Sequence, residues 1–412
     1  MHEASVAPRN ELPIPSPSGR ERSLDLLRGW VMLLMALDHV RDFVHRGAMT
    51  GLPTDLDTTT PAIFATRWIT HICAPAFALT AGMGAWFHWQ RSGSKVQTSK
   101  FLLTRGLWLI LLELLVMRFA YYFNFSLEYT TPLLALWSLG LSMILLAALI
   151  WLPQRLVLIG AVTIILLHPL LAVVSAGSAG MAATFWDILH GVAIFNLANM
   201  TFAAPYSLLP WAAVMALGFA IAPVVRREQA ARRRLLNKMG IGSLLVFAAL
   251  RAINQYGDPS RWQVFDSATF TVMSFLNVSK YPASPAFLFM TLGTVLLLLA
   301  WCDQVARNHS KVTDRVAMFG RVPLFYYILH FYVAHLAASV IALTRYGHEA
   351  AHLLFIPYPS FGGSADNFPA DFGVGLAAMY TVWLVVVATC YPLCQRFARA
   401  KQRGTSSWMR YF

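Results

Sequence analysis

Long apolar stretches recur along almost the whole chain and are separated by more polar segments of varied length. Each stretch is about 20 residues long, which is the length at which a helix crosses the hydrocarbon core of a bilayer. The pattern predicts an all-α polytopic membrane protein with about ten spanning helices. These are predicted at residues 24–44, 68–90, 101–123, 132–152, 155–175, 205–225, 237–254, 283–302, 322–344 and 373–395.

The composition supports this class. Hydrophobic residues make up 57% of the chain and charged residues only 12%, against roughly 25% charged in an ordinary soluble domain. A mean hydropathy of +0.56 over 412 residues excludes a single water-soluble core. Residues 1–23 are polar, carry no apolar run and predict a disordered tail rather than a signal peptide. We therefore expect one membrane domain over residues 24–399, followed by a C-terminal tail over 400–412.

The basic residues predict how the chain lies in the membrane. The formal net charge is +13, and 22 of the 32 Lys and Arg fall in alternate segments that include both ends of the chain. Only five fall in the loops on the other side. Positive residues concentrate in cytoplasmic segments, so both termini are expected in the cytoplasm. The positive net charge then reflects how the chain is oriented in the membrane, and no nucleic-acid partner is expected.

Charged and polar side chains follow one stripe of the first predicted helix. At 100° per residue, Asp25, Arg28, His39 and Asp42 fall within an arc of about 100°. Ionisable residues inside a membrane are costly and are functional candidates by default. His39 is a candidate general base, oriented by Asp38 or Asp42. The alternatives are a structural histidine held by hydrogen bonds and, for Arg28, a snorkelling side chain paired with Asp25.

Further candidates lie at the ends of later helices. His71 opens the second predicted helix at the same level as His39, and the two could share proton-transfer work. We favour base chemistry over a metal site, because no motif supplies a third ligand. Gly320-Arg-Val-Pro begins the ninth helix, where Arg321 at a helix N-terminus would suit an anion; a capped, positive-inside boundary is the alternative. His330 follows Tyr326 by one turn, and we favour a structural hydrogen-bonded pair there.

An ordered set of motifs resembles a known family. The set comprises Arg22-Ser-Leu-Asp-Leu-Leu-Arg-Gly, Thr70-His-Ile-Cys-Ala-Pro-Ala-Phe-Ala-Leu-Thr-Ala-Gly, Lys280-Tyr-Pro-Ala-Ser-Pro, Met290-Thr-Leu-Gly, Gly320-Arg-Val-Pro-Leu-Phe-Tyr-Tyr and the ending Trp408-Met-Arg-Tyr-Phe. Together they resemble the heparan-alpha-glucosaminide N-acetyltransferase catalytic-domain family. That family belongs to a wider group of transmembrane acyltransferases that includes bacterial cell-surface O-acyltransferases.

The resemblance implies a reaction, its co-substrate and its partners. It implies transfer of an acyl group, usually acetyl, from cytoplasmic acyl-CoA to a hydroxyl or amine of a saccharide-type acceptor at the outer face. The lipid bilayer, acyl-CoA and that acceptor are the expected partners, and a homodimer is compatible with the sequence. A bacterial inner membrane is the expected location, and no metal is predicted. Arg28, Arg105 and Arg321 are the expected ligands of the CoA phosphates.

The resemblance also bears on which histidine is catalytic. The spacing of Arg28 and His39 matches the Arg–His spacing of the bacterial O-acyltransferase members. The lysosomal members have an Asn where His39 stands and place their essential histidine in the first lumenal loop, where this chain has His45 at a different spacing. His71 takes the place of a carboxylate in those members. His39, His71 and His45 therefore remain alternatives for the base.

A proton-coupled secondary transporter is the competing class. Intramembrane Asp, Glu, His and Arg residues are the groups such a carrier would use. The sequence shows no pair of Gly- or Pro-broken helices in two matching halves, which many transporters have. We therefore prefer an acyltransferase to a permease.

Overall fold

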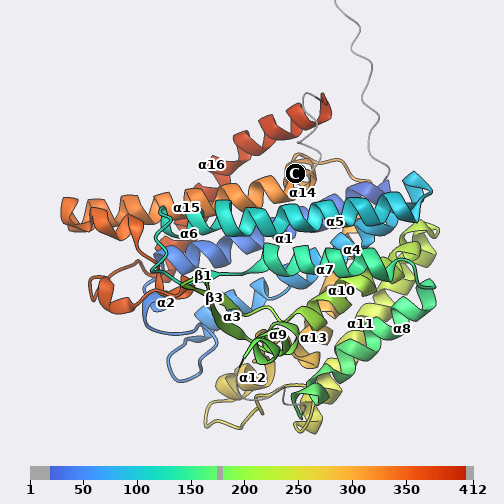
Figure 1. Ribbon diagram of the computed structural model, residues 1–412, viewed down its shortest axis with the longest axis horizontal. Helices are drawn as coiled ribbons and strands as arrows, with labels where there is room; N and C mark the ends of the chain where they lie inside the picture. Colours follow the sequence, from blue (N-terminus) through green and yellow to red (C-terminus); the bar gives the residue numbers. More distant parts are fainter. Residues whose placement is uncertain (1–18, 174–179, 405–412) are drawn as a thin grey trace, which may run out of the picture.

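The computed structural model describes residues 19–173 and 180–404, and it is mostly helical (Figure 1). The predicted N-terminal tail lies largely outside the described residues, as do most of the predicted C-terminal tail and the Trp408-Met-Arg-Tyr-Phe motif. The first half contains α1 (Gly19–Val44), α2 (Gly47–Thr50), α3 (Pro61–Thr70), α4 (Cys73–Ser92), α5 (Lys95–Leu112), α6 (Arg118–Tyr122), α7 (Ala135–Leu149) and α8 (Gln154–Leu167). The second half contains α9 (Met181–His190), α10 (Leu208–Ile221), α11 (Gln229–Ile253), α12 (Ala268–Leu276), α13 (Pro285–Val305), α14 (Lys311–Arg321), α15 (Pro323–Tyr346) and α16 (Leu376–Gln402).

Helices of spanning length occupy most of the predicted positions. Seven helical segments of the described chain are long and apolar enough to cross a membrane. These are Pro61–Ser92, Gln154–Leu171, Leu208–Arg226, Gln229–Ile253, Pro285–Val305, Pro323–Tyr346 and Leu376–Gln402. The other three predicted spans correspond to α1, to α5 with α6, and to α7, a shorter apolar helix. The chain is thus a helical multi-pass membrane protein, while the total of ten spans and the side of the termini stay predictions.

Local sequence signals define several helix starts. Pro61 and Pro285 occupy first-turn positions of α3 and α13, where the missing N–H costs nothing. The Ser284 hydroxyl caps α13 by accepting a hydrogen bond from the Phe287 N–H at 3.0 Å. A capping box between Ser310 and Thr313 begins α14.

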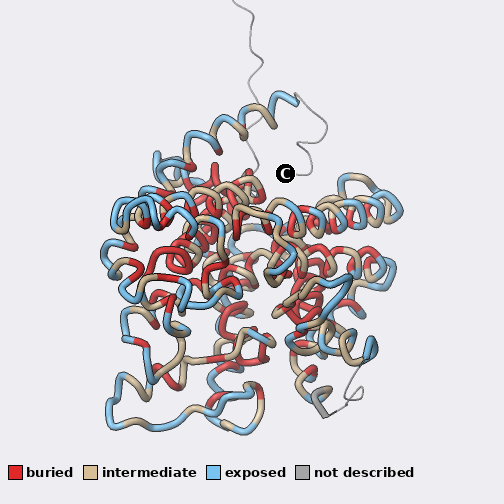
Figure 2. Tube along the Cα trace, turned by 60° about the vertical axis from the view of Figure 1, so that its left-hand side comes forward, coloured by how far each residue is buried: buried red, intermediate tan, exposed pale blue. Residues whose placement is uncertain are grey.

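Helix α1 lies at the centre of the bundle. It packs against α14, α15, α13, α16, α4 and α3, and in Figure 1 it runs alongside α15. The buried residues concentrate in this middle region, while the loops at one end of the molecule are largely exposed (Figure 2). Because its polar stripe is enclosed by neighbouring helices, α1 can carry charged side chains through the membrane region without exposing them to lipid.

Glycines allow two helix pairs to approach closely. A Cβ atom added to Gly320 would lie 1.8 Å from the Asp25 carbonyl oxygen, so α14 and α1 touch through their backbones. This contact gives the Gly320-Arg-Val-Pro motif a packing role. A Cβ added to Gly82 would lie 1.9 Å from the Met215 carbonyl oxygen, at the contact of α4 with α10. Small residues commonly mediate such packing in membranes.

Replacing Gly82 with Ala is expected to destabilise the fold by about 1–3 kcal/mol, the usual cost of overpacking. The new methyl group meets a backbone carbonyl, which cannot move without separating α4 from α10. The measurement is thermal unfolding of the purified protein in detergent. Gly160→Ala on α8 is the matched control, because its new Cβ has no atom within 4 Å. Equal melting temperatures for the two variants would contradict the packing role.

A small sheet was not expected from the sequence. Strands β1 (Thr131–Pro132), β2 (Ala193–Leu197) and β3 (Met200–Ala204) lie in the order β1-β3-β2. β1 runs parallel and β2 antiparallel to β3. The apolar segment 185–194 is divided between α9 and the start of β2. The apolar segment 264–275 largely forms α12.

Candidate functional site

A cavity of about 650 Å³ runs beside α1, a size typical of small-molecule sites. Its lining includes Arg28 near one end of α1 and Asp42 near the other. At 1.5 Å per residue these two positions are about 21 Å apart. The cavity therefore extends along most of the length that α1 would occupy in a bilayer.

One end of the cavity is basic. Arg28 of α1, Arg91 of α4 and Arg105 of α5 all line it. The Arg28 guanidinium donates a hydrogen bond to the Thr80 carbonyl at 2.9 Å, which fixes its direction. Among the described residues that line the cavity, the only carboxylates are those of Asp38 and Asp42, which lie toward the other end of α1. The arginine end thus carries an excess of positive charge.

Arg321, the third predicted ligand of the CoA phosphates, lies elsewhere. It does not line the cavity, and its Nε atom is 3.8 Å from the Asp25 carboxylate. The structure therefore brings Arg28 and Arg105 together, adds Arg91 to them and leaves Arg321 outside the cavity.

His39 lines the cavity about 16 Å along α1 from Arg28. Its Nδ1 atom lies 2.7 Å from Nε2 of His330 on α15, and the two rings stack with centroids 5.0 Å apart. The Phe331 ring packs against His39 at 4.1 Å and the Tyr327 ring approaches edge-on at 6.2 Å. His39 Nε2 forms no hydrogen bond with any described residue. The sequence predicted a structural role for His330, and no spacing within α1 could indicate this contact.

The neighbouring carboxylates form ion pairs rather than a contact with His39. Asp38 pairs with Arg67 of α3, and its other oxygen is 3.5 Å from Arg41. Asp42 pairs with Arg41. We expected Asp38 or Asp42 to orient His39; within the described chain its hydrogen bond goes instead to His330. The carboxylates compensate the charges of the two arginines.

His71 and His45 lie outside the cavity lining. His71 is buried at the break between α3 and α4, where its Nδ1 lies 2.7 Å from the Arg67 carbonyl. His45 follows α1 and accepts a hydrogen bond from the Gly47 N–H at 3.1 Å. Burial, reinforced by Arg41 and Arg46, lowers the pKa of His45 below its usual value. Residues 19–173 and 180–404 contain no group of three His, Cys, Asp or Glu side chains placed to hold a metal ion.

Sequence reasoning assigned no role to Lys280, Tyr281 and Tyr206 at the other end of the cavity. The Lys280 ammonium lies 5.3 Å from the centre of the Tyr206 ring and 5.0 Å from that of Tyr281, within the range of cation–π attraction. The two tyrosine hydroxyls are 3.3 Å apart. The Lys280-Tyr-Pro motif, one of those that resemble the family, was the sequence feature that could have indicated Lys280 and Tyr281.

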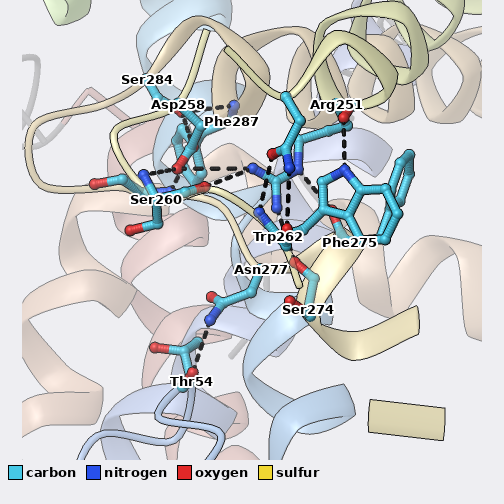
Figure 3. A network of polar contacts seen from close by, with 12 residues as sticks. Thr54, Arg251, Asp258, Ser260, Trp262, Ser274, Phe275, Asn277, Ser284 and Phe287 are labelled. Atoms are coloured by element: carbon cyan, nitrogen blue, oxygen red, sulfur yellow. Dashed lines mark hydrogen bonds and ion pairs between the residues drawn. The ribbon is translucent and has the colours of Figure 1, made fainter. Parts of the chain in front are cut away.

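A polar network holds the loop that carries Lys280 (Figure 3). Arg251, near the end of α11, donates hydrogen bonds to the carbonyls of Phe275, Ser274 and Ser260 at 2.8–2.9 Å. The Asp258 carboxylate accepts hydrogen bonds from the Ser284 hydroxyl at 2.6 Å and the Ser279 N–H at 2.9 Å. Burial raises the pKa of Asp258, and the bonds from Ser284 and Ser279 oppose this shift. Because Ser279 precedes Lys280, the network fixes the lysine at the cavity.

The helical fold defines a multi-pass membrane protein that encloses a cavity with charged side chains between its helices. The chain belongs to the family described as heparan-alpha-glucosaminide N-acetyltransferase, catalytic, whose model matches residues 20–257, more than half of its length. The family predicted from the motifs is thereby confirmed. The matched region contains His39, Arg28 and Arg105, whereas Lys280 and His330 lie beyond it. No curated protein matches the chain.

Proposed function

We propose that this membrane transferase moves an acetyl group from acetyl-CoA to a hydroxyl or amine of a saccharide acceptor. The supporting observation is that a single cavity is lined both by an arginine cluster and, about 16 Å further along α1, by His39. CoA enters from the cytoplasm of a bacterial cell at the arginine end. The acceptor reaches His39 from the outer end.

The arginine end binds the donor. CoA is polyanionic, and hydrogen bonds between guanidinium groups and phosphates are among the stronger ones in proteins. Arg28, Arg91 and Arg105 come from three different helices and line the same end of the cavity. They hold the phosphates, while the extended pantetheine arm follows the polar stripe of α1 and brings the thioester to His39.

His39 acts as the general base. Its Nε2 atom takes the proton of the acceptor hydroxyl or amine while the acceptor oxygen or nitrogen attacks the thioester carbonyl. The C–S bond then breaks, and the proton on Nε2 passes to the departing CoA sulfur. The products are the acetylated acceptor and free CoA, and His39 regains its starting protonation state.

The outer end suits a small polar acceptor. The rings of Tyr206, Tyr281 and Trp211 line it together with the ammonium of Lys280 and the guanidinium of Arg67. Apolar and aromatic surfaces with a few fixed polar groups are typical of small-molecule sites. The network around Asp258 holds this surface in place without belonging to it.

The test of this proposal is turnover of acetyl-CoA by the purified protein in liposomes with glucosamine as acceptor. We expect release of free CoA thiol and formation of N-acetylglucosamine in equal amounts. A proton-coupled carrier is the second candidate, because the charged side chains of Asp38, Arg67 and Asp42 line the cavity. A carrier would leave the thioester intact, so binding without thiol release would favour it over the transferase.

A further inference from the structure

The contact between His39 and His330 joins α1 to α15 inside the bundle. We infer that His330 is a positioning residue that fixes the tautomer of His39, so that His39 Nε2 is the unprotonated nitrogen in the cavity. This inference rests on the proposed function, in which Nε2 receives the acceptor proton. It concerns a residue that lies outside the part of the chain matched by the family.

The hydrogen bonds of His330 have a direction. Its Nδ1 lies 2.9 Å from the Tyr326 carbonyl oxygen, and a carbonyl can only accept, so Nδ1 carries a proton. A neutral imidazole with a proton on Nδ1 has a lone pair on Nε2. His330 Nε2 therefore accepts the hydrogen bond at 2.7 Å, and His39 Nδ1 donates it. His39 is then left with its own lone pair on Nε2.

The surroundings of His330 favour the neutral ring. His330 is completely buried, and no described carboxylate lies within ion-pair distance of it. Its ring packs against Tyr326, Tyr327 and Phe331 of its own helix and against His39 of α1. An unpaired charge in such an apolar site would be costly. The Tyr326 carbonyl thus sets the tautomers of both histidines.

The arrangement also matters during the reaction. When His39 Nε2 takes the acceptor proton, the ring becomes an imidazolium with N–H groups on both nitrogens. The Nδ1–H remains hydrogen-bonded to the lone pair of His330, which keeps the ring oriented and stabilises its charge. In serine hydrolases a carboxylate has this role toward the catalytic histidine. Here the two nearest carboxylates, Asp38 and Asp42, are engaged with arginines.

A purely structural role for His330 would lead to a different experimental result. If His330 only filled space and stacked on His39, an aromatic ring without nitrogen would replace it at little cost to the reaction. If it sets the tautomer, the loss of its acceptor nitrogen frees His39 to place its proton on Nε2 instead. The two roles therefore differ in the protonation pattern of His39 and in kcat.

The first test is the ¹⁵N NMR spectrum of the full-length protein, labelled at histidine, in detergent micelles. Spectra of His39→Ala and His330→Phe assign the two rings. We expect His39 to be protonated on Nδ1 in the wild type and to populate the Nε2-protonated form in His330→Phe. A wild-type spectrum with His39 protonated on Nε2 would overturn the inference. This measurement needs no turnover, so it separates failure of the inference from failure of the proposed reaction.

The second test is kinetic, with acetyl-CoA and glucosamine as substrates. His330→Phe keeps the ring and removes the acceptor, and we expect kcat to fall about 100-fold, the scale at which partners that orient an active group act. KM for acetyl-CoA should change less than about twofold. His330→Gln places an amide oxygen near the original Nε2 position, so its kcat should be about tenfold higher than that of His330→Phe. A folded His330→Phe protein with wild-type kcat would contradict the role.

Discussion

Replacement of His39 by Ala is expected to lower kcat for acetyl transfer by about 10³-fold, within the range in which general bases act. Among the described residues, His39 has the only imidazole that lines the cavity on the acceptor side of the arginine cluster, whereas His88 lines the basic end. Binding of acetyl-CoA should be retained, because the phosphate ligands lie about 16 Å away. Thiol release and CoA binding by the purified variant check both expectations.

His71→Ala and His45→Ala are the matched controls. Neither histidine lines the cavity, and each has a local hydrogen bond to backbone. We expect both variants to keep kcat within about threefold of wild type, provided that they insert and melt normally, because a base must reach the proton that it removes. If His39→Ala were active and His71→Ala inactive, His71 rather than His39 would be the general base.

Loss of either guanidinium, in Arg28→Gln or Arg105→Gln, is expected to raise KM for acetyl-CoA by about 10- to 100-fold. A hydrogen bond to a charged group contributes about 1.5–3 kcal/mol, and 1.4 kcal/mol corresponds to a factor of ten. kcat at saturating donor should change much less, because neither arginine reaches the thioester. Titration with acetyl-CoA gives both constants.

Arg321→Gln is the control for this second prediction. Arg321 lies beside Asp25 and outside the cavity lining, so its removal should change KM by less than about threefold. Wild-type KM values in both Arg28→Gln and Arg105→Gln would show that the donor does not bind at this end. A large effect of Arg321→Gln alone would place the phosphates nearer to the start of α15.

Much of the helical architecture could be predicted from the sequence, because runs of about 20 apolar residues are a strong signal. The prediction is weakest where charges interrupt the runs. α1 carries its polar stripe, and α5 carries Lys95, Lys100 and Arg105, so neither qualifies as a span by composition. The sheet was missed because its strands have two to five residues, and short apolar runs do not distinguish strands from helices.

The half of the site that lies on α1 could be predicted from spacing. Arg28, His39 and Asp42 share one face of a single helix, and all three line the cavity. The partner of His39 could not be predicted in this way. His330 is 291 positions away, and a contact of that range depends on how α15 packs against α1. For the same reason the pairing of Asp38 with Arg67 of α3 is a product of tertiary structure.

In the proposed reaction, one cavity joins a donor on the cytoplasmic side to an acceptor on the other side through His39. The most direct measurement uses proteoliposomes that enclose glucosamine. Acetyl-CoA with a labelled acetyl group is added outside the vesicles, to protein whose arginine cluster faces outward. We expect labelled N-acetylglucosamine inside the vesicles and free CoA outside, and we expect neither product with His39→Ala. Intact thioester outside, with glucosamine crossing unmodified, would contradict the proposed reaction and identify a carrier.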